Sequence, residues 1–255
     1  MSETFYRVLI IIACFIVGYL CGSIPNGVII SKIFYKKDVR NYGSHNSGGT
    51  NTGRVFGKKA GLITILLDII KVLIPFIVAI RLFEFNVTIK EFMNPTYNTL
   101  SVFGEGNTLN QLCYYIVPVG GMLGHAYSVF LKFKGGKIVS TFACYCLGTT
   151  FLSVPVVLPV FLITLKAKKY VSLSSIVASG FTVLLNLGIF LTYLFTFREH
   201  GFGIVDYLMW FGIGPRCSIY LPLITIFSWL LLVYKHKANI DRILDGTENK
   251  ITWMK

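Results

Sequence analysis

Residues 62–83 read LITILLDIIKVLIPFIVAIRLF, and this apolar run decides the fold class. Its length suits the hydrocarbon core of a bilayer, which takes about 20 residues of α-helix to cross. Asp68 and Lys71 interrupt the run at a spacing of i, i+3, which places both side chains on one face of a helix. Because a lone charge in the bilayer costs roughly 2.5–3.5 kcal/mol, we expect the two to pair and to face a bundle interior. A structural ion pair and a substrate-facing pair both fit this pattern.

The whole chain has the composition of a membrane protein, with 54% hydrophobic residues, 14% charged residues and a mean hydropathy of +0.67. Apolar runs recur along it. The predicted spans are 5–33, 62–83, 112–131, 138–153, 154–165, 171–197 and 218–234. The fourth and fifth are short and share Pro155 and Pro159, so they form either a tight hairpin or one broken segment. The first run leads into GSIPNG rather than a small-x-small cleavage site, so we expect it to be retained.

The cations are distributed very unevenly between the two sides of these spans. Lys and Arg number 24 against 11 Asp and Glu, a formal net charge of +13. Seven spans place eighteen of the cations on one side and Lys71 within a span. The five on the other side are Arg7, Arg81, Lys90, Arg198 and Arg216. By the positive-inside rule the N-terminus is outside and the C-terminus is cytoplasmic.

These observations predict an all-α integral membrane protein with about seven transmembrane helices, forming a single polytopic domain over residues 1–255. A six-span arrangement would move much of the basic charge outside, and we reject it. Residues 84–110 and 198–217 become outside loops without a compact chemical motif. The cytoplasmic position of the cations favours bilayer lipid and an anionic substrate as partners, and no nucleic acid.

The stretch 38–59, DVRNYGSHNSGGTNTGRVFGKK, differs most from its apolar surroundings. Glycines alternate in it with hydroxyl and amide side chains, and no carboxylate follows Asp38 until Asp68. Its cations are Arg40, Arg54, Lys58 and Lys59. Backbone N–H groups near glycine, side-chain donors and uncompensated cations favour an oxyanion cradle, with phosphate as its ligand. A flexible loop with positive-inside charges is the alternative, which spacing alone does not exclude.

A second glycine-containing stretch, GHAYSVFLKFKGGK over residues 124–137, has the same character. Gly135 and Gly136 lie between Lys134 and Lys137 at the end of a span, where N–H and ammonium groups can hold an anion together. The spacing is not that of a P-loop, so nucleoside triphosphate binding is not predicted. Interfacial lysines alone would leave the glycines unexplained.

The C-terminal half adds two polar clusters on the predicted cytoplasmic side. In HKANIDRILDGTENK, His236 and Asn239 share a face if the last span continues as a helix beyond the membrane. In KKYVSLSSI, Ser175 and its neighbouring serines begin the sixth span, where capping is the default role and donation to a phosphate the alternative. The six cysteines have no metal-type spacing and are interpreted as packing residues.

Six motifs of this chain, taken together and in order, resemble the PlsY family of membrane glycerol-3-phosphate acyltransferases. They extend over most of the chain, from Gly22 to Glu248, and are GSIPNG, the 38–59 stretch with the following AG, LLDIIK, GHAYSVFLKFKGGK, SLSSI and HKANIDRILDGTE. The resemblance implies acyl transfer from acyl-phosphate to the 1-hydroxyl of sn-glycerol 3-phosphate. The products are lysophosphatidate and inorganic phosphate. It implies no metal, no cofactor, no coenzyme A or carrier-protein donor, and an active site on the cytoplasmic face of the cell membrane.

Positions that match the family's functional residues are retained. The implied catalytic residues are Ser44, Asn46, Lys137, His236 and Asn239. The implied substrate-binding residues are Asn51, Arg54, Lys134, Gly135, Gly136 and Ser175. Several neighbours depart from the family pattern: His45, Ser47 and Gly49 stand where the family usually has Gly, a hydrophobic residue or Pro, and Ala; Ser128 replaces Pro; Ile138 and Ser140 replace Gly and Ala. These changes bear on loop geometry rather than on chemistry.

A transporter for a phosphorylated small molecule is the alternative function, because it would also need intramembrane charge and a basic face. It predicts a pathway open to both sides. The cations cluster on one side, and no paired broken helices indicate alternating access. Neither an oligomeric state nor an acyl-chain preference follows from the sequence.

Overall fold

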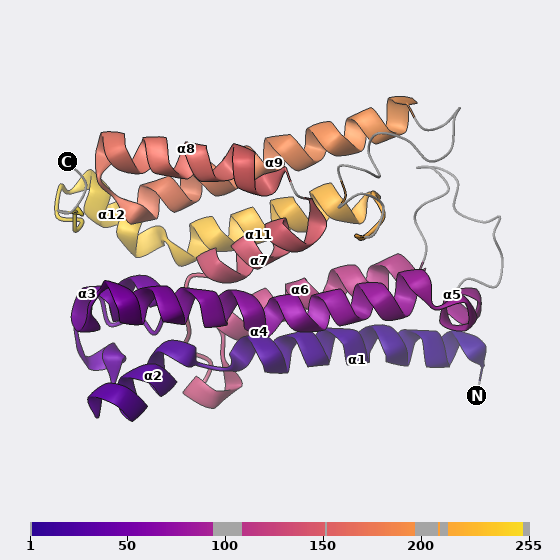
Figure 1. The fold of residues 1–255 in the computed structure, drawn as a ribbon, viewed down its shortest axis with the longest axis horizontal. Coiled ribbons are helices and arrows are strands. Elements are labelled where there is room, and N and C mark those ends of the chain that lie inside the picture. The colour runs from indigo at the N-terminus through magenta and orange to yellow at the C-terminus, as the bar shows by residue number, and fades with distance from the viewer. Residues whose placement is uncertain (1, 94–108, 151, 197–208, 210–213, 252–255) are drawn as a thin grey trace. The chain divides into compact units, whose positions relative to one another are not determined.

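The computed structural model describes residues 2–93, 109–150, 152–196, 209 and 214–251, and all regular elements within these residues are helices (Figure 1). Most of the predicted outside loops therefore lies outside the described residues. The longer helices are α1 (Glu3–Ser23), α4 (Lys58–Phe85), α6 (Leu109–Ala126), α8 (Ser153–Lys168), α9 (Val171–Thr196) and α11 (Tyr220–Lys235). The shorter elements are α2 (Asn26–Tyr35), η1 (Val39–Asn41), α3 (Gly49–Phe56), α5 (Val87–Met93), η3 (Val129–Leu131), α7 (Val139–Thr149) and α12 (Lys237–Leu244).

Contacts divide the chain into two compact units. Unit 1 contains Met1–Leu82 and Cys113–Tyr145, and unit 2 contains Phe83–Leu112 and Cys146–Lys255. That the whole chain forms one domain stays a prediction, because a division by contacts does not show whether either unit folds alone. Each unit is described by itself below.

Within the described residues, three helical segments are long and apolar enough to cross a membrane: Glu3–Tyr35, Lys58–Phe85 and Val171–Phe195. Val139–Thr149 and Tyr220–Lys235 are shorter apolar helices. The predicted fourth and fifth spans are separate helices, α7 and α8. The total of seven spans remains a prediction.

The first predicted span, 5–33, is not one helix. It divides at Ile24 and Pro25 into α1 and α2. Proline has no N–H and its ring disfavours a continuous helix, so the backbone restarts with Val28 and Ile29 both donating to the Pro25 carbonyl. The apolar composition on both sides of Pro25 concealed this break, which places α2 and the following loop beside the end of α1.

Helices α1 and α6 of unit 1 pack with their backbones almost in contact. Gly18 faces the Val117 backbone, and Gly22 faces the backbone of Gly121. A β-carbon at either position of α1 would overlap main-chain atoms of α6. Small residues four apart permit this close approach between membrane helices, and it fixes where the end of α6 meets the α1–α2 break.

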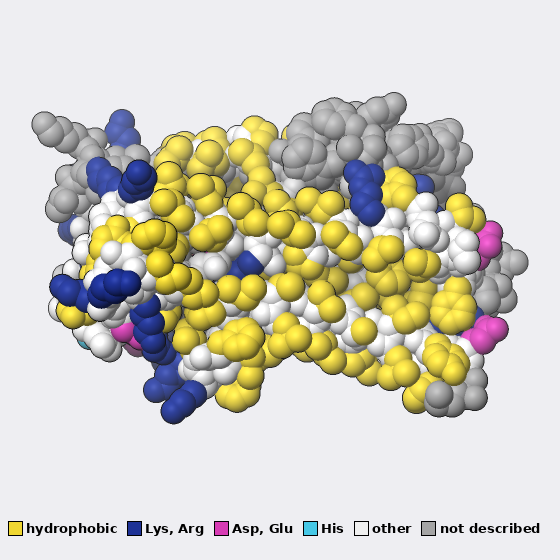
Figure 2. Space-filling view, turned by 60° about the horizontal axis from the view of Figure 1, so that its bottom comes forward, with side chains coloured by type: hydrophobic (Ala, Val, Ile, Leu, Met, Phe, Trp, Pro, Cys, Tyr) yellow, Lys and Arg dark blue, Asp and Glu magenta, His cyan; other side chains and the backbone are white. Residues whose placement is uncertain are grey.

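The surface of unit 1 separates apolar from basic side chains. Along α1 and α4, large apolar residues such as Ile12, Ile16 and Ile74 are 47%, 47% and 58% exposed, which fits contact with lipid tails. Figure 2 shows Lys and Arg side chains gathered at the end where α2 and α3 lie. Exposed Lys32 and Lys59 belong to this end of the unit.

Unit 2 is a helical layer in which α9 packs against α8 and α11 (Figure 1). Polar side chains join α9 to α11 inside it. Asn186 Nδ2 donates to Thr225 Oγ1 at 2.8 Å, and Trp229 Nε1 donates to the Ile176 carbonyl at 3.3 Å. The short helix α12 packs against α9, which brings the C-terminal polar segment to the start of that helix.

Candidate active site

The loop that follows α2 begins with an ion pair between two of its own residues, Asp38 and Arg40. Arg40 donates through Nε to Asp38 Oδ1 at 3.0 Å and through Nη2 to Oδ2 at 2.7 Å. Asp38 also accepts from the Arg40 N–H and so caps η1. The hydrogen bond from Arg40 is the main reason why the pKa of Asp38 lies at about 2. The expectation that all four cations of this loop are uncompensated was therefore wrong for Arg40, whose charge is used within the loop.

Asn51 organises the rest of this loop. Its Oδ1 accepts from the Ser44 N–H at 2.8 Å, and its Nδ2 lies within 3.1 Å of the carbonyl oxygens of Val39, Tyr42 and Asn46. The residue is 1% exposed. Because its amide is engaged with backbone groups, Asn51 holds the loop in shape, and its predicted contact with a substrate remains a prediction.

The predicted catalytic residues Ser44 and Asn46 lie on the surface that Asn51 shapes. Asn46 Oδ1 accepts from the Gly48 N–H at 2.8 Å, which forms a turn directly before α3. Arg54 is in the last turn of α3 and is exposed, and it makes no ion pair with the residues that the structure describes. This part of the loop therefore presents a guanidinium group close in sequence to hydroxyl and amide side chains.

Gly135 and Gly136 are required for close contact rather than for an unusual backbone conformation. Neither adopts a positive φ. A β-carbon at Gly135 would meet the His125 carbonyl, and one at Gly136 would meet the His125 ring. The Gly136 N–H also donates to the His125 carbonyl at 2.8 Å. The end of α6 thus forms the floor under the two glycines, with Lys134 exposed on one side and Lys137 half-buried on the other.

Two of the departures from the family pattern occupy left-handed backbone positions. His45 has a φ of 55° and Ile138 a φ of 56°, and both stand where the resemblance implies glycine. This conformation costs a non-glycine residue roughly 1–2 kcal/mol. Both loops therefore keep a glycine-type backbone geometry even though the glycine is absent.

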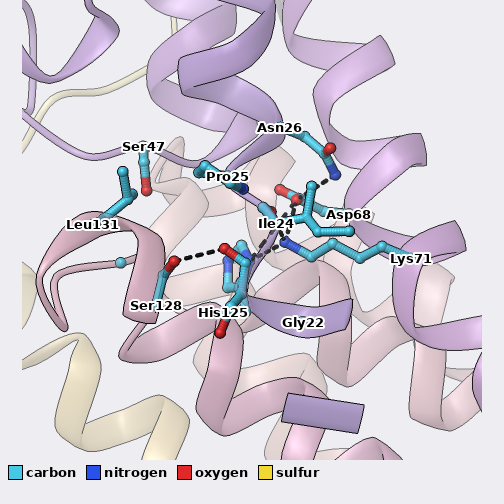
Figure 3. Close-up of a pocket in the computed structure, with 12 residues that line it drawn as sticks. Gly22, Ile24, Pro25, Asn26, Ser47, Asp68, Lys71, His125, Ser128 and Leu131 are labelled. Atoms are coloured by element: carbon cyan, nitrogen blue, oxygen red, sulfur yellow. Dashed lines mark hydrogen bonds and ion pairs between the residues drawn. The ribbon is translucent and has the colours of Figure 1, made fainter. Parts of the chain in front are cut away.

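Asp68 and Lys71 of α4 form the ion pair that their spacing predicted, at 2.8 Å, with side chains that are 2% and 6% exposed. Lys71 Nζ also contacts the Ile24 carbonyl at 2.7 Å and His125 Nδ1 at 3.1 Å, and Asn26 donates to Asp68 at 3.0 Å. Figure 3 shows these side chains pointing toward one another from three parts of unit 1. The sequence did not indicate that His125 completes this pair.

A small polar cavity lies beside this cluster. Ser47 of the first loop, Ser128 and Gly135 of the second, and residues of the α1–α2 break all line it (Figure 3). Ser128 Oγ donates to the Ser23 carbonyl at 2.6 Å. The two predicted anion loops therefore meet around one cavity within unit 1.

In unit 2, Glu248 joins the two C-terminal polar clusters. Its carboxylate accepts from Ser172 at 3.0 Å, from Asn239 at 2.7 Å and from Arg242 at 2.7 Å. Burial raises the pKa of Glu248, and these hydrogen bonds outweigh burial and bring the pKa below its usual value. The sequence does not indicate this role of Glu248, because only the folded chain brings Ser172 next to it.

His236 occupies a break between two helices. The condition under which His236 and Asn239 would share a helix face is met only with an interruption, because α11 ends at Lys235 and α12 begins at Lys237. His236 Nδ1 lies 2.8 Å from the Leu232 carbonyl, which can only accept, so Nδ1 carries a proton. In the neutral ring Nε2 is then the nitrogen that accepts a proton. Asn239 starts the next turn, but its side-chain amide is held by Glu248.

Ser175 Oγ donates to the Val171 carbonyl one turn earlier in α9, at 2.9 Å. It therefore does not cap the helix, and its hydroxyl oxygen retains acceptor capacity. The serine cluster and the C-terminal segment are also linked by the Ile251 N–H, which donates to the Lys169 carbonyl at 2.8 Å. Within the described residues, no group of three or more His, Cys, Asp or Glu is placed to hold a metal ion.

The predicted site residues are thus divided between the two units. Unit 1 holds those of the two anion loops: Ser44, Asn46, Asn51, Arg54, Lys134, Gly135, Gly136 and Lys137. Unit 2 holds Ser175, His236 and Asn239. Within the described residues, apolar helices joined by polar and basic loops define the class of all-α membrane proteins, and anion binding by these loops remains a prediction.

Comparison with known proteins gives the family. The family model for glycerol-3-phosphate acyltransferase matches residues 12–246. A glycerol-3-phosphate acyltransferase of Staphylococcus carnosus (strain TM300) is 37% identical over 96% of this chain and 100% of its own length. One from Fusobacterium nucleatum subsp. nucleatum is 35% identical over 93% of this chain and 96% of its own. The chain belongs to the glycerol-3-phosphate acyltransferase family.

Two solved structures share the fold. They are crystal structures of PlsY (YgiH), an integral membrane glycerol 3-phosphate acyltransferase, in its glycerol 3-phosphate and lysophosphatidic acid forms. The first has a TM-score of 0.67 and 27% identity and covers 97% of this chain and 96% of that one. The second has a TM-score of 0.65 and 26% identity over 95% of each chain. The resemblance stated from the sequence is confirmed at the level of the family.

Proposed function

We propose that this chain transfers a fatty acyl group from acyl-phosphate to the 1-hydroxyl of sn-glycerol 3-phosphate, releasing lysophosphatidate and inorganic phosphate. The observation that carries the proposal is full-length similarity to glycerol-3-phosphate acyltransferases, together with an exposed Arg54 on a loop rich in hydrogen-bond donors. Such an enzyme supplies the first acylated intermediate of phospholipid synthesis.

The loops of unit 1 provide groups suited to two phosphate-bearing substrates. Arg54 offers a planar fork that matches two phosphate oxygens. Lys134 and Lys137 flank the glycine pair, where positive charge and backbone N–H groups occur together. We assign Arg54 to glycerol 3-phosphate, and we assign residues 134–138, called the glycine–lysine loop below, to a phosphate group of either substrate.

The reaction needs orientation more than a strong base. Acyl-phosphate is a mixed anhydride with a good leaving group, so positioning and stabilisation of the developing oxyanion supply most of the rate. The 1-hydroxyl oxygen attacks the acyl carbon, the carbon–oxygen bond to phosphate breaks, and phosphate leaves with the bonding electrons. We place Ser44 and Asn46 around the reacting carbonyl.

The hydroxyl proton goes either to Nε2 of His236 or to the departing phosphate. The Nδ1 contact of His236 with the Leu232 carbonyl supports the first route, because it leaves Nε2 as the acceptor in the neutral ring. If His236 is the base, His236→Gln lowers kcat and removes the acidic limb of the pH–rate profile. If phosphate takes the proton, that limb persists in the variant.

We also propose seven spans, with the N-terminus outside and the active site on the cytoplasmic face. The eighteen-to-five distribution of cations supports this arrangement. With the native cysteines replaced, single cysteines at Lys58 and Lys250 should react with an impermeant reagent only from the cytoplasm. A cysteine at Val87, which is 68% exposed, should react only from outside. Labelling of Val87 and Lys58 sites from the same side would refute the topology.

The donor is tested with purified protein in detergent or nanodiscs. We expect acyl-phosphate to support formation of lysophosphatidate with equimolar release of phosphate, and acyl-CoA to support neither. Efficient turnover with acyl-CoA would refute the proposed donor. Absence of acyl transfer from both donors, with folded protein, would refute the proposed activity.

Arg54→Lys tests the acceptor site. It keeps the positive charge and loses the bidentate geometry, so we expect KM for glycerol 3-phosphate to rise about tenfold or more, the effect of losing roughly 1.4 kcal/mol or more of binding. Exposed Lys168→Arg in α8 is the matched control, and it should leave KM unchanged. An unaltered KM in Arg54→Lys would remove Arg54 from the acceptor site.

A further inference from the structure

The buried cluster of Asp68, Lys71 and His125 is not needed by the proposed chemistry, and its presence requires an explanation. All three side chains are 8% exposed or less. Placing a charge within a membrane helix costs roughly 2.5–3.5 kcal/mol on insertion scales. An apolar pair at these two positions of α4 would avoid that cost, so pairing alone does not explain why the charges are there.

Hydrogen-bond geometry assigns the protonation of His125. A lysine ammonium has three N–H donors and no acceptor. Three acceptors surround Lys71 Nζ: the Ile24 carbonyl at 2.7 Å, Asp68 Oδ1 at 2.8 Å and His125 Nδ1 at 3.1 Å. His125 Nδ1 must therefore accept a hydrogen bond from Lys71, so this nitrogen carries no proton. His125 is then a neutral ring with its proton on Nε2, the opposite arrangement to His236.

That ring is also the floor of the glycine–lysine loop. Nε2 lies where a side chain of Gly136 would be, and the His125 carbonyl accepts from the Gly136 N–H at 2.8 Å. The same carbonyl blocks a side chain at Gly135. His125 therefore touches the loop through both its main chain and its ring, while Lys71 fixes the ring from the other side (Figure 3).

We propose that Asp68, Lys71 and His125 are positioning residues for the loop Gly135–Lys137. Lys71, charge-balanced by Asp68, holds the His125 ring in one orientation and one tautomer, with Nε2–H under Gly136. This arrangement sets the place of the glycine N–H groups and of Lys137. The inference rests on the proposed function only in that the loop is taken to hold a phosphate group.

The first test measures protonation directly and does not depend on activity. Protein with 15N-labelled histidine rings in nanodiscs gives separate signals for bare and protonated nitrogens, and His125→Gln identifies those of His125 among the four histidines. We expect a neutral ring with bare Nδ1 and protonated Nε2. In Lys71→Met we expect loss of this single state. A wild-type ring protonated on Nδ1 would overturn the proposal, as would an unchanged spectrum in the variant.

The second test separates positioning from simple pairing. Asp68→Leu combined with Lys71→Met removes both charges together, so no unpaired charge remains in the membrane. We expect this double variant to stay folded, with a lower detergent midpoint because the Ile24 carbonyl and the Asn26 amide each lose a partner, and to have kcat/KM for glycerol 3-phosphate at least tenfold lower. Wild-type activity in the double variant would mean that the ion pair is only structural, and it would overturn the proposal. Lys168→Met, an exposed lysine of α8, is the matched control with unchanged kinetics.

A pair of substitutions at His125 covers the case in which the double variant does not fold. The His125→Gln amide reaches the place of Nε2, whereas the shorter His125→Asn amide reaches only that of Nδ1. We expect the glutamine variant to retain at least tenfold more activity than the asparagine variant. We also expect the Gly136 N–H to exchange faster in the asparagine variant than in the glutamine variant. Equal behaviour of the two would overturn the proposal. If the wild-type protein catalyses no acyl transfer, the exchange and 15N measurements still decide the positioning role.

Discussion

Ile138→Gly places opposing effects of known size at one position of the glycine–lysine loop. Ile138 has a φ of 56° and its side chain is 0% exposed. Glycine would relieve roughly 1–2 kcal/mol of left-handed strain, and about 0.5–1 kcal/mol of that is offset by its greater freedom in the unfolded chain. Loss of a buried isoleucine side chain costs about 2–5 kcal/mol. We therefore expect a net destabilisation of about 0.5–5 kcal/mol, although glycine is the residue that the family resemblance implies there.

The assay is unfolding of purified protein by SDS titration in mixed micelles, which gives a difference in free energy of unfolding between variant and wild type. His45→Gly is the matched control, because His45 has almost the same φ but an exposed side chain. It loses only the 2.9 Å contact between Nδ1 and the Arg40 carbonyl. Relief of about 1–2 kcal/mol of strain should nearly cancel the loss of one hydrogen bond, about 0.5–1.5 kcal/mol, together with about 0.5–1 kcal/mol for the freedom of glycine in the unfolded chain.

A gain in stability for Ile138→Gly would refute the reasoning, because it would mean that burial of this side chain contributes less than the strain of its backbone. Equal destabilisation by Ile138→Gly and His45→Gly would have the same effect. The expected difference between them is large enough to resolve, since 1.4 kcal/mol corresponds to a tenfold change in an equilibrium constant.

Three further predictions concern the loops. Gly135→Ala should lower kcat by up to about a hundredfold even at saturating substrate, because the new methyl group displaces the loop from the His125 carbonyl; a change confined to KM would contradict this, and steady-state kinetics measure it. The wild type should have a higher free energy of unfolding than Asp38→Asn, by an amount that is constant above about pH 5. This difference should shrink as the pH falls from about 3.9, the pKa of Asp in the unfolded chain, toward the folded pKa of about 2. A difference that grows on acidification would contradict this prediction. Glu248→Gln should destabilise unit 2 by about 1.5–3 kcal/mol through loss of a charge-assisted bond to Arg242, seen as faster hydrogen exchange in residues 236–251, and exchange at the wild-type rate would exclude that role.

Much of the fold follows from apolar periodicity and length alone. The run at 62–83 predicted α4, and the i, i+3 spacing within it predicted the pairing of Asp68 with Lys71. The observed helix is longer, because Lys58 and Lys59 begin it while remaining at the surface. The break at Pro25 was the main miss: hydropathy sums over a window and does not register one absent N–H.

The site was predictable in residue type but not in connectivity. Glycine, amide and cationic composition indicated the two anion loops, yet an amide does not reveal its partners until the path of the loop is known. Composition indicated Asn51 as a substrate-binding residue but did not indicate that its amide lies among three carbonyl groups of its own loop. Glu248 and His125 depend on contacts over more than fifty positions of sequence, with Ser172 and Lys71 respectively, and no local pattern reports such contacts.

The interruption between α1 and α2 has a consequence for how this protein can change. Pro25 ends the first helix, and the Ile24 carbonyl there accepts from the Asn26 N–H at 3.1 Å and from the ammonium of Lys71 at 2.7 Å. Without this contact, and among the described residues, the carbonyl would keep only the Asn26 N–H as a donor, and the ammonium would keep only Asp68 and His125 as acceptors. Because the contact stabilises both groups, loss of the helix break at Pro25 would remove part of what stabilises a buried lysine at position 71, and loss of the lysine would weaken the break. Relatives with an uninterrupted first helix should therefore lack the lysine, and the two features should be inherited or discarded as a pair.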